Sequence, residues 1–346
     1  MRAKVLKVVL VNLALLLGLV VVAELIFGDW LRSDPIARLD LPRGTAVTVN
    51  PEGLYPGAQP FLYRRDRWAL RGAGVDPAKV TILTIGGSTT NQLFLPDEQT
   101  WQAVAEREFR AQGRDDVVVA NAGIDGQSTV GHIKSLEDWF PAIPNLRPRF
   151  VLAYVGLNDV HVSGAWIDDL RHPDPIKRFR QRSAIIRAWG KVAGILKARQ
   201  AKLTHHRVDY AGVEWTDTPA EPDFSAGPNS TPEAYKARLK RMAQLIHEMG
   251  AVPVLVTQPR GDYRVVDGKV LGVASTEGRN GVDNYRLLAR FNQATREVCR
   301  DEGLLCLDLA RELTFETGDF YDLLHTSPSG SEKIGRWLHA KLAGLV

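Results

Sequence analysis

Short apolar runs of strand-forming residues alternate along this chain with longer segments of helical periodicity. Five runs rich in Val, Ile and Leu are predicted to be buried strands: residues 80–85, 117–120, 150–155, 252–257 and 304–309. Five segments with apolar residues at helical spacing lie between and after them: residues 98–112, 129–140, 235–250, 284–302 and 331–345. Strands that alternate with helices form a parallel sheet covered by helices on both faces. The sequence therefore predicts an α/β fold with a doubly wound sheet.

The first 28 residues differ in character from the rest. Three basic residues, Arg2, Lys4 and Lys7, precede the sixteen uncharged residues Val8–Ala23. A span of about 20 apolar residues crosses a bilayer core, and no good small-residue cleavage site follows. We interpret residues 1–28 as an uncleaved signal anchor, with a cleaved signal peptide and a buried core helix as the alternatives. The positive-inside rule then places the remainder outside the cytoplasm, in the periplasm or the extracellular space.

The rest of the chain divides into regions that differ in composition and in the alternation of predicted strands and helices. Residues 29–78 are rich in Pro, Gly and Arg without a sustained period, which predicts a linker and an extended cover segment. Residues 79–346 carry the alternating pattern and form the predicted α/β domain. Residues 163–232 interrupt that pattern as an insertion, and within it residues 171–207 hold eleven Lys and Arg against one acidic residue.

The basic insertion contains a candidate amphipathic helix. Four apolar residues fall on one helical face, and basic residues surround them: Ile185, Trp189, Val192 and Leu196, with Arg187, Lys191, Lys197 and Arg199. The favoured interpretation is a lid whose apolar face packs on the core. The alternative is a surface helix, with residues 171–207 contacting an anionic glycan or lipid. Nucleic acid is not an expected partner, because no basic groove with interleaved aromatic residues is present.

Four short polar segments carry residue types suited to catalysis, in a fixed order. They are Gly86-Gly87-Ser88-Thr89, Asn121–Gly126, Gly156–Asp159 and Asp322–His325. The first three directly follow predicted strands, and the fourth lies in a loop before the last helix. Ligands of doubly wound sheets bind outside the carboxyl ends of the strands. The common location predicts one shared site.

A nucleophile and an acid–base pair can be assigned within these segments. Ser88 follows two glycines at a strand-to-helix turn, which would expose its hydroxyl; a helix N-cap or a phosphate-cradling turn is the alternative. His325 could take the serine proton while Asp322 orients the imidazole, although a surface Asp and a surface His would have the same spacing. His161 is a weaker candidate, interpreted as a supporting residue because it follows Asp159 closely.

Oxyanion stabilisation requires hydrogen-bond donors that face the nucleophile. The backbone N–H of Gly126 and the side-chain amide of Asn158 are candidates, together with the N–H of Ser88. A turn glycine and an Asx-turn asparagine are the structural alternatives for the first two.

The ordered segments resemble the SGNH (GDSL-type) hydrolases, whose four blocks carry Ser, Gly, Asn and His. The resemblance covers roughly residues 79–159 and 250–345. It implies a flavodoxin-like three-layer α/β/α sandwich with a five-stranded parallel sheet, and an acyl-serine intermediate without metal or cofactor. It places the catalytic and oxyanion roles on the residues assigned above: Ser88, Gly126, Asn158, Asp322 and His325. The usual Asp before the serine is Gly87 here, and Thr89 replaces the usual Leu, which resembles a GGST-type subgroup.

On this resemblance we expect a membrane-anchored, extracytoplasmic serine esterase. Its expected substrate is a small-molecule or glycan ester of a small acyl group, such as an O-acetyl group on a cell-envelope or secreted polysaccharide. Two alternatives stay open: an O-acyltransferase acting on envelope polysaccharide, and a non-catalytic glycan-binding or assembly factor. The chain has two cysteines, Cys299 and Cys306, which are either bridged or separately buried.

Overall fold

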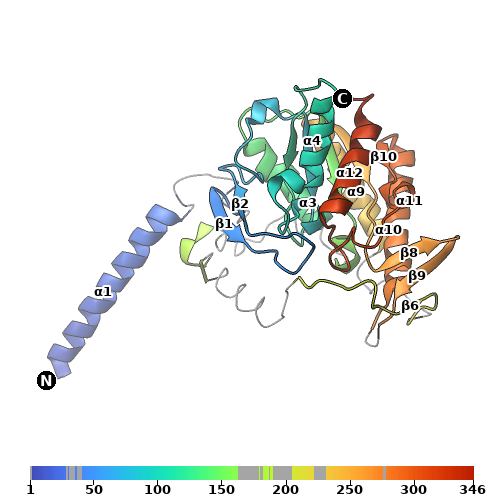
Figure 1. Cartoon of the computed structure of the whole chain (residues 1–346). Helices are drawn as coiled ribbons and strands as arrows, with labels where there is room; N and C mark the ends of the chain where they lie inside the picture. The colour runs from blue at the N-terminus through green and yellow to red at the C-terminus, as the bar shows by residue number, and fades with distance from the viewer. Residues whose placement is uncertain are drawn as a thin grey trace. The chain divides into compact units, whose positions relative to one another are not determined.

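A computed structural model describes the chain over most of its length (Figure 1). The described residues are 2–28, 30, 36, 41–162, 179, 182–186, 188–189, 205–221, 231–275 and 278–346. The chain divides into two compact units. Residues 1–41 and 168–204 belong to the smaller unit, and residues 42–167 and 205–346 to the larger one. The larger unit contains the central sheet and all four polar segments singled out in the sequence.

The central sheet has five parallel strands in the order β10-β7-β5-β3-β4. The strands are β3 (Ile82–Gly86), β4 (Val119–Asn121), β5 (Phe150–Tyr154), β7 (Val252–Val256) and β10 (Leu305–Leu307). Numbered along the chain, this is the flavodoxin-like order 2-1-3-4-5. The predicted fold class is confirmed, and each predicted strand overlaps an observed one.

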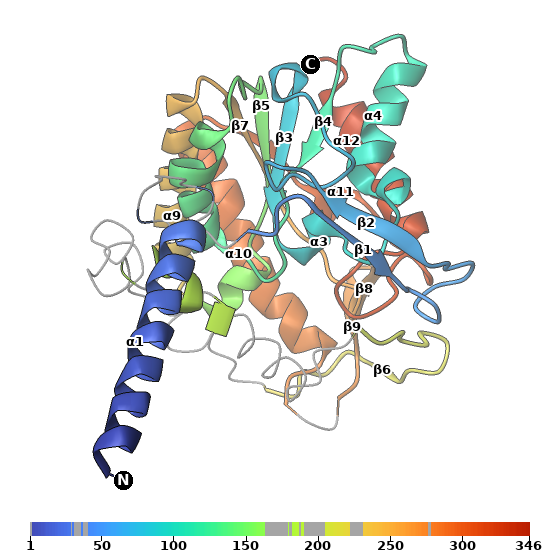
Figure 2. The same cartoon turned by 90° about the vertical axis from the view of Figure 1, so that its left-hand side faces the viewer.

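Helices cover both faces of this sheet (Figures 1 and 2). On one face α4 (Trp101–Ala111) packs against α12 (Pro328–Leu342), and on the other α9 (Pro232–Glu248) packs against α10 (Gly281–Glu302) and α5 (Thr129–Lys134). Apolar side chains of the first pair, such as Trp101 and Leu338, form a core with Phe150 and other residues of the sheet. Shorter elements complete the unit: η1 (Pro77–Lys79), α3 (Ser88–Asn91), η2 (Asp97–Gln99), η3 (Ser135–Trp139), η4 (Phe140–Ala142), η5 (Asn158–His161) and α11 (Leu309–Glu312).

The strand order reverses between β3 and β5, and the site lies at that point. β3 pairs with β4 on one side and with β5 on the other. The loops that leave the carboxyl ends of β3 and β5 therefore diverge, and the crevice between such loops is where doubly wound sheets bind ligands. Ser88 begins α3 two residues after the end of β3, and Asn158 begins η5 four residues after the end of β5.

Two smaller sheets were absent from the sequence prediction. In the segment predicted as linker and cover, β1 (Thr45–Val49) and β2 (Phe61–Arg65) pair as antiparallel strands. In residues 205–221, which lie within the predicted insertion, β6 (Trp215–Thr216) joins the hairpin of β8 (Tyr263–Val266) and β9 (Lys269–Val273). All five strands are short, and their side chains are mostly half-buried or exposed, so the alternation of apolar residues that predicts a strand is missing.

The smaller unit contains α1 (Arg2–Phe27), the one helix among the described residues that is long and apolar enough to cross a membrane. Glu24 near its end accepts hydrogen bonds from Ser183 Oγ (2.6 Å) and from the amides of Ala184 and Ile185 (3.0 and 3.1 Å). In the predicted amphipathic helix, Ile185 and Trp189 are exposed, at 44% and 74%. Val192 and Leu196 lie outside the described residues.

The two cysteines are free thiols at the junction of α10 and β10. A hydrogen bond to Cys306, together with burial, raises the pKa of the Cys299 thiol. The structure therefore gives a close pair of thiols, and no bridge.

Candidate active site

The turn from β3 into α3 fixes the position of Ser88. β3 ends at Gly86, and Ser88 is the first residue of α3. A Cβ atom on Gly86 would lie 2.0 Å from Thr90 Oγ1, and one on Gly87 would lie 2.3 Å from Asn158 Nδ2. Real Cβ atoms do not approach so closely, so a side chain at either position would displace a neighbouring group, Thr90 or Asn158.

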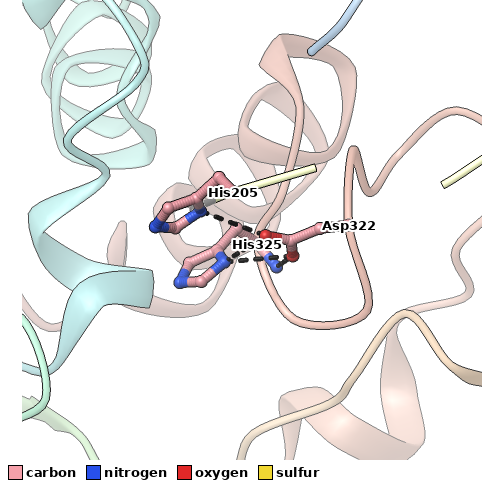
Figure 3. Close-up of side chains that lie close together, drawn as sticks. All are labelled: His205, Asp322 and His325. Atoms are coloured by element: carbon pink, nitrogen blue, oxygen red, sulfur yellow. Dashed lines mark hydrogen bonds and ion pairs between the residues drawn. The ribbon is translucent and has the colours of Figure 1, made fainter. Parts of the chain in front are cut away.

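Ser88, His325 and Asp322 form one hydrogen-bonded chain. His325 Nε2 lies 2.8 Å from Ser88 Oγ, and His325 Nδ1 lies 2.7 Å from Asp322 Oδ2 (the latter pair is drawn in Figure 3). An ionised carboxylate can only accept hydrogen bonds, so Nδ1 carries the proton. In the neutral ring, Nε2 then accepts the hydrogen bond that Ser88 Oγ donates. An imidazole in this tautomer can take a proton from a serine hydroxyl.

The surroundings of Asp322 keep its carboxylate ionised. Its Oδ1 accepts hydrogen bonds from the backbone amides of Leu324 (2.8 Å) and His325 (2.6 Å). Burial raises the pKa of Asp322, but the hydrogen bonds from His205 and His325 outweigh burial and hold the pKa well below its usual range. The group that faces the His325 imidazole is therefore a charged carboxylate at neutral pH.

His205 is a member of this cluster that the sequence analysis missed. Its Nδ1 lies 3.1 Å from Asp322 Oδ2 and 3.1 Å from the hydroxyl of Tyr321. Figure 3 shows the His205 ring beside that of His325, and their centroids are 4.4 Å apart. No local pattern marks His205, because its carboxylate partner lies 117 residues further along the chain.

The same three side chains offer two nitrogens and a carboxylate, the donor types that bind zinc. The ligand atoms of His205, Asp322 and His325 lie within 4.8 Å of one another. In the structure these atoms hydrogen-bond to one another, so a metal ion there would replace the bond between His325 and Asp322.

The two predicted oxyanion residues lie on neighbouring loops. Asn158 Nδ2 donates to the carbonyl of Gln127 (3.0 Å) and lies against Gly87, next to the serine. Gly126, one residue before Gln127, has a φ of +72° in a turn closed by the hydrogen bond from Gln127 N to Ile124 O (3.1 Å). A positive φ at this position of a turn favours glycine. The Asn158 amide therefore reaches both the serine turn and the Gly126 loop.

Two buried polar side chains, which no sequence motif marks, connect the serine turn to its neighbours. Gln92, which ends α3, donates from Nε2 to Thr326 Oγ1 (3.1 Å), beside His325, and accepts from the amide of Trp101 (2.9 Å). Arg71 of the cover segment donates to the carbonyl of Gln92 (2.6 Å) and pairs with Asp97 (3.0 Å). These contacts hold α3 against the loop that carries His325.

Asp159 and His161 lie apart from the Ser88 cluster. Asp159 is fully buried and accepts hydrogen bonds from Arg238 Nη2 (3.0 Å) and the amide of Thr129 (3.1 Å). Its contacts link the loop after β5 to α9 and α5, which is a structural role. His161 lines a small cavity with Arg260, and its pKa is lowered by burial and by the charges of Arg279 and Arg260.

Comparison with known proteins gives one family. A sequence model of the GDSL-like Lipase/Acylhydrolase family matches residues 84–333, which include the four catalytic segments. No curated protein matches this chain.

Solved structures similar to this chain include a GDSL-like lipase from Bacteroides thetaiotaomicron VPI-5482 (11% identity, TM-score 0.41, 80% of this chain and 93% of that one). An acetylxylan esterase from Geobacillus stearothermophilus, solved as a catalytic mutant, is 14% identical (TM-score 0.42, 76% and 92%). Another acetyl xylan esterase is also 14% identical (TM-score 0.42, 77% and 99%).

Proposed function

This chain belongs to the GDSL-like lipase/acylhydrolase family, and from that premise we propose that it is a serine esterase with Ser88 as its nucleophile. One observation carries the assignment: the continuous hydrogen-bonded chain from Ser88 Oγ through His325 to the Asp322 carboxylate. Each member has the atom that its role needs within hydrogen-bond distance of the next. A serine, a histidine and an aspartate that were merely surface residues would not share this geometry.

The proposed reaction proceeds in two halves. Ser88 Oγ attacks the ester carbonyl carbon while His325 Nε2 takes its proton, and the carbonyl π electrons move onto oxygen. The N–H groups of Ser88 and Gly126 and the Asn158 amide stabilise this oxyanion, and Asp322 stabilises the imidazolium. The intermediate expels the alcohol, which takes the proton from His325, and leaves an acyl-serine. Water, deprotonated by His325, then attacks the acyl carbon, and Ser88 recovers its proton as the acid is released.

We propose that the enzyme acts outside the cytoplasm, anchored by α1. The candidate span of α1 runs 24 residues from Lys4 to Phe27, with Arg2, Lys4 and Lys7 at or before its start and no basic residue in its last turn. This length suffices for a bilayer core, and the charge distribution favours a cytoplasmic N-terminus. That location favours O-acetyl groups on an envelope or secreted carbohydrate as the substrate.

The exposed Trp189 and Ile185, held at the end of α1 through Glu24, support a contact of the basic insertion with the lipid surface. Trp is enriched at membrane interfaces, where its ring is amphipathic.

The test is acetate release from p-nitrophenyl acetate by the full chain in detergent. Ser88→Ala should lower kcat by at least about 1,000-fold with the fold intact by circular dichroism. Ser329→Ala, a serine near the exposed start of α12, is the matched control and should retain wild-type turnover. Turnover in Ser88→Ala within about twofold of wild type would refute the nucleophile assignment. Acetyl groups found on an added oligosaccharide, instead of in water, would identify a transferase.

A further inference from the structure

The Asp322 carboxylate has a second imidazole partner that the esterase mechanism does not use. Its Oδ1 accepts hydrogen bonds from the backbone amides of Leu324 and His325. Its Oδ2 accepts hydrogen bonds from His325 Nδ1 (2.7 Å) and His205 Nδ1 (3.1 Å). A carboxylate has about four lone-pair sites. His205 therefore fills the last one.

The proton on His205 can be assigned from its partners. The carboxylate only accepts, so Nδ1 of His205 donates to it and shares the same N–H with the Tyr321 hydroxyl oxygen, which lies 3.1 Å away. Figure 3 shows both rings presenting Nδ1 to Asp322, with both Nε2 atoms directed away from it on the same side.

The backbone and the neighbouring rings hold His205 in this position. Its ring lies between Phe94 (centroids 4.6 Å apart) and His325 (4.4 Å). The segment that follows is tied to the same loop, because Val208 N donates to Tyr321 O (2.8 Å) and the Tyr210 hydroxyl donates to Asp322 O (2.5 Å). Residues 205–210 thus bind the Asp322 loop through the His205 imidazole, the Val208 backbone amide and the Tyr210 hydroxyl.

We propose that His205 is a positioning residue of the esterase site, whose Nδ1–H fixes the Asp322 carboxylate against His325 and limits how strongly that carboxylate favours the imidazolium. The inference rests on the proposed roles of Ser88 and His325. A donor on Oδ2 draws negative charge away from His325. Loss of that donor should both loosen the carboxylate and make the imidazolium of His325 more stable.

In the part of the chain that the structure describes, few other groups facing this cluster can change protonation near neutral pH. The hydroxyls of Tyr321 and Tyr210 face it, and burial together with the Asp322 charge raises the pKa of both above its usual range, so both stay neutral. The carboxylate of Asp125 acts on Tyr321 through its charge. Ser88 faces His325 from α3.

Two substitutions separate the hydrogen bond from the bulk of the ring. His205→Phe keeps a ring between Phe94 and His325 but removes the donor, whereas His205→Asn keeps a donor near the position of Nδ1. In His205→Phe, we expect kcat for p-nitrophenyl acetate to fall about tenfold with KM nearly unchanged, and the acid limb of kcat/KM to move up by about one pH unit. His205→Asn should restore most of the turnover and the acid limb.

The outcomes are distinguishable from failure of the esterase proposal. NMR titration of the histidine ring resonances reports the pH at which His325 takes up its proton, whether or not an ester is cleaved. A shift of that titration to higher pH in His205→Phe, absent in His205→Asn, supports the proposal. An unchanged titration and pH profile in His205→Phe would overturn it, as would equal losses in both variants.

Discussion

At the scale of single residues, the environment of Gly87, just before Ser88, leaves little room for a side chain. The amide of Asn158 occupies the volume that a side chain at position 87 would need, since a Cβ there would lie 2.3 Å from Nδ2. The Asp that this family usually carries at this position therefore cannot be accommodated with Asn158 in its present place. Gly87 in place of that Asp is thus compatible with the close approach of Asn158 to the serine turn.

Gly87→Ala should therefore act through Asn158. We expect the displaced amide to lower kcat by about 10- to 100-fold, and Asn158→Ala alone to lower it by about 100- to 1,000-fold. The double variant should be no worse than Asn158→Ala, because the two changes remove one interaction. The measurement is kcat for p-nitrophenyl acetate, with Gly344→Ala, a site with open space, as the control. Additive losses in the double variant would show that Gly87 acts independently of Asn158.

The sequence predicted those residues of the candidate site that lie in short motifs. It missed the residues that contact the site from segments without a motif. Ser88, Asn158 and His325 were identified because each follows a recognisable segment, and the structure brings all three to one edge of the sheet. His205 and Gln92 have no such context. Their partners Asp322 and Thr326 are 117 and 234 residues away, and only the folded chain brings these atoms together.

At the scale of elements, the apolar runs predicted the five strands of the central sheet and missed the more exposed strands outside it. All five residues of β3 and of β5 are buried, so their sequences are continuous apolar runs. β1 has no fully buried residue, so its sequence carries no such pattern. The segment it belongs to nevertheless supplies Arg71, which donates to carbonyls around α3. A segment whose sequence does not predict a strand can thus still supply a polar residue that stabilises the site.

The proposal that α1 spans a membrane can be tested by introducing one charged residue. An Arg at the centre of a spanning helix costs about 2.5–3.5 kcal/mol of insertion free energy, and less near an end, where the side chain reaches the headgroups. Leu16→Arg should therefore shift the protein from the membrane fraction to the soluble fraction, and Val5→Arg should not. Alkaline extraction followed by immunoblotting measures the distribution. Equal membrane retention of both variants would argue against a spanning α1.

At the scale of the whole molecule, one buried histidine links stability to pH. His132 on α5 is 1% exposed, and neither ring nitrogen has a hydrogen-bond partner in the part of the chain that the structure describes. Burial lowers the pKa of His132 from 6.5 to about 3. Below pH 6.5 the His132 ring binds a proton in the unfolded chain but stays neutral in the folded chain. The free energy of unfolding therefore decreases as the pH falls below 6.5.

The wild-type free energy of unfolding should therefore lose about 1.4 kcal/mol per pH unit below pH 6.5 on account of His132. His132→Leu removes this contribution, so its stability should fall less steeply between pH 6.5 and 4.5. Urea denaturation at several pH values measures both slopes. His247→Leu, an exposed histidine on α9, should keep the wild-type slope. Identical slopes in His132→Leu and the wild type would mean that this ring takes up a proton inside the fold.

The hydrogen bond between Ser88 and His325 joins residues 237 positions apart in the sequence. During synthesis the segments that carry Ser88 and Asn158 therefore emerge long before the loop of His325. Closing so long a loop is entropically costly and must await the C-terminal strand and helix that carry the loop of His325. Under the proposed mechanism, a chain that ends before His325 lacks the base for Ser88 and should not cleave esters.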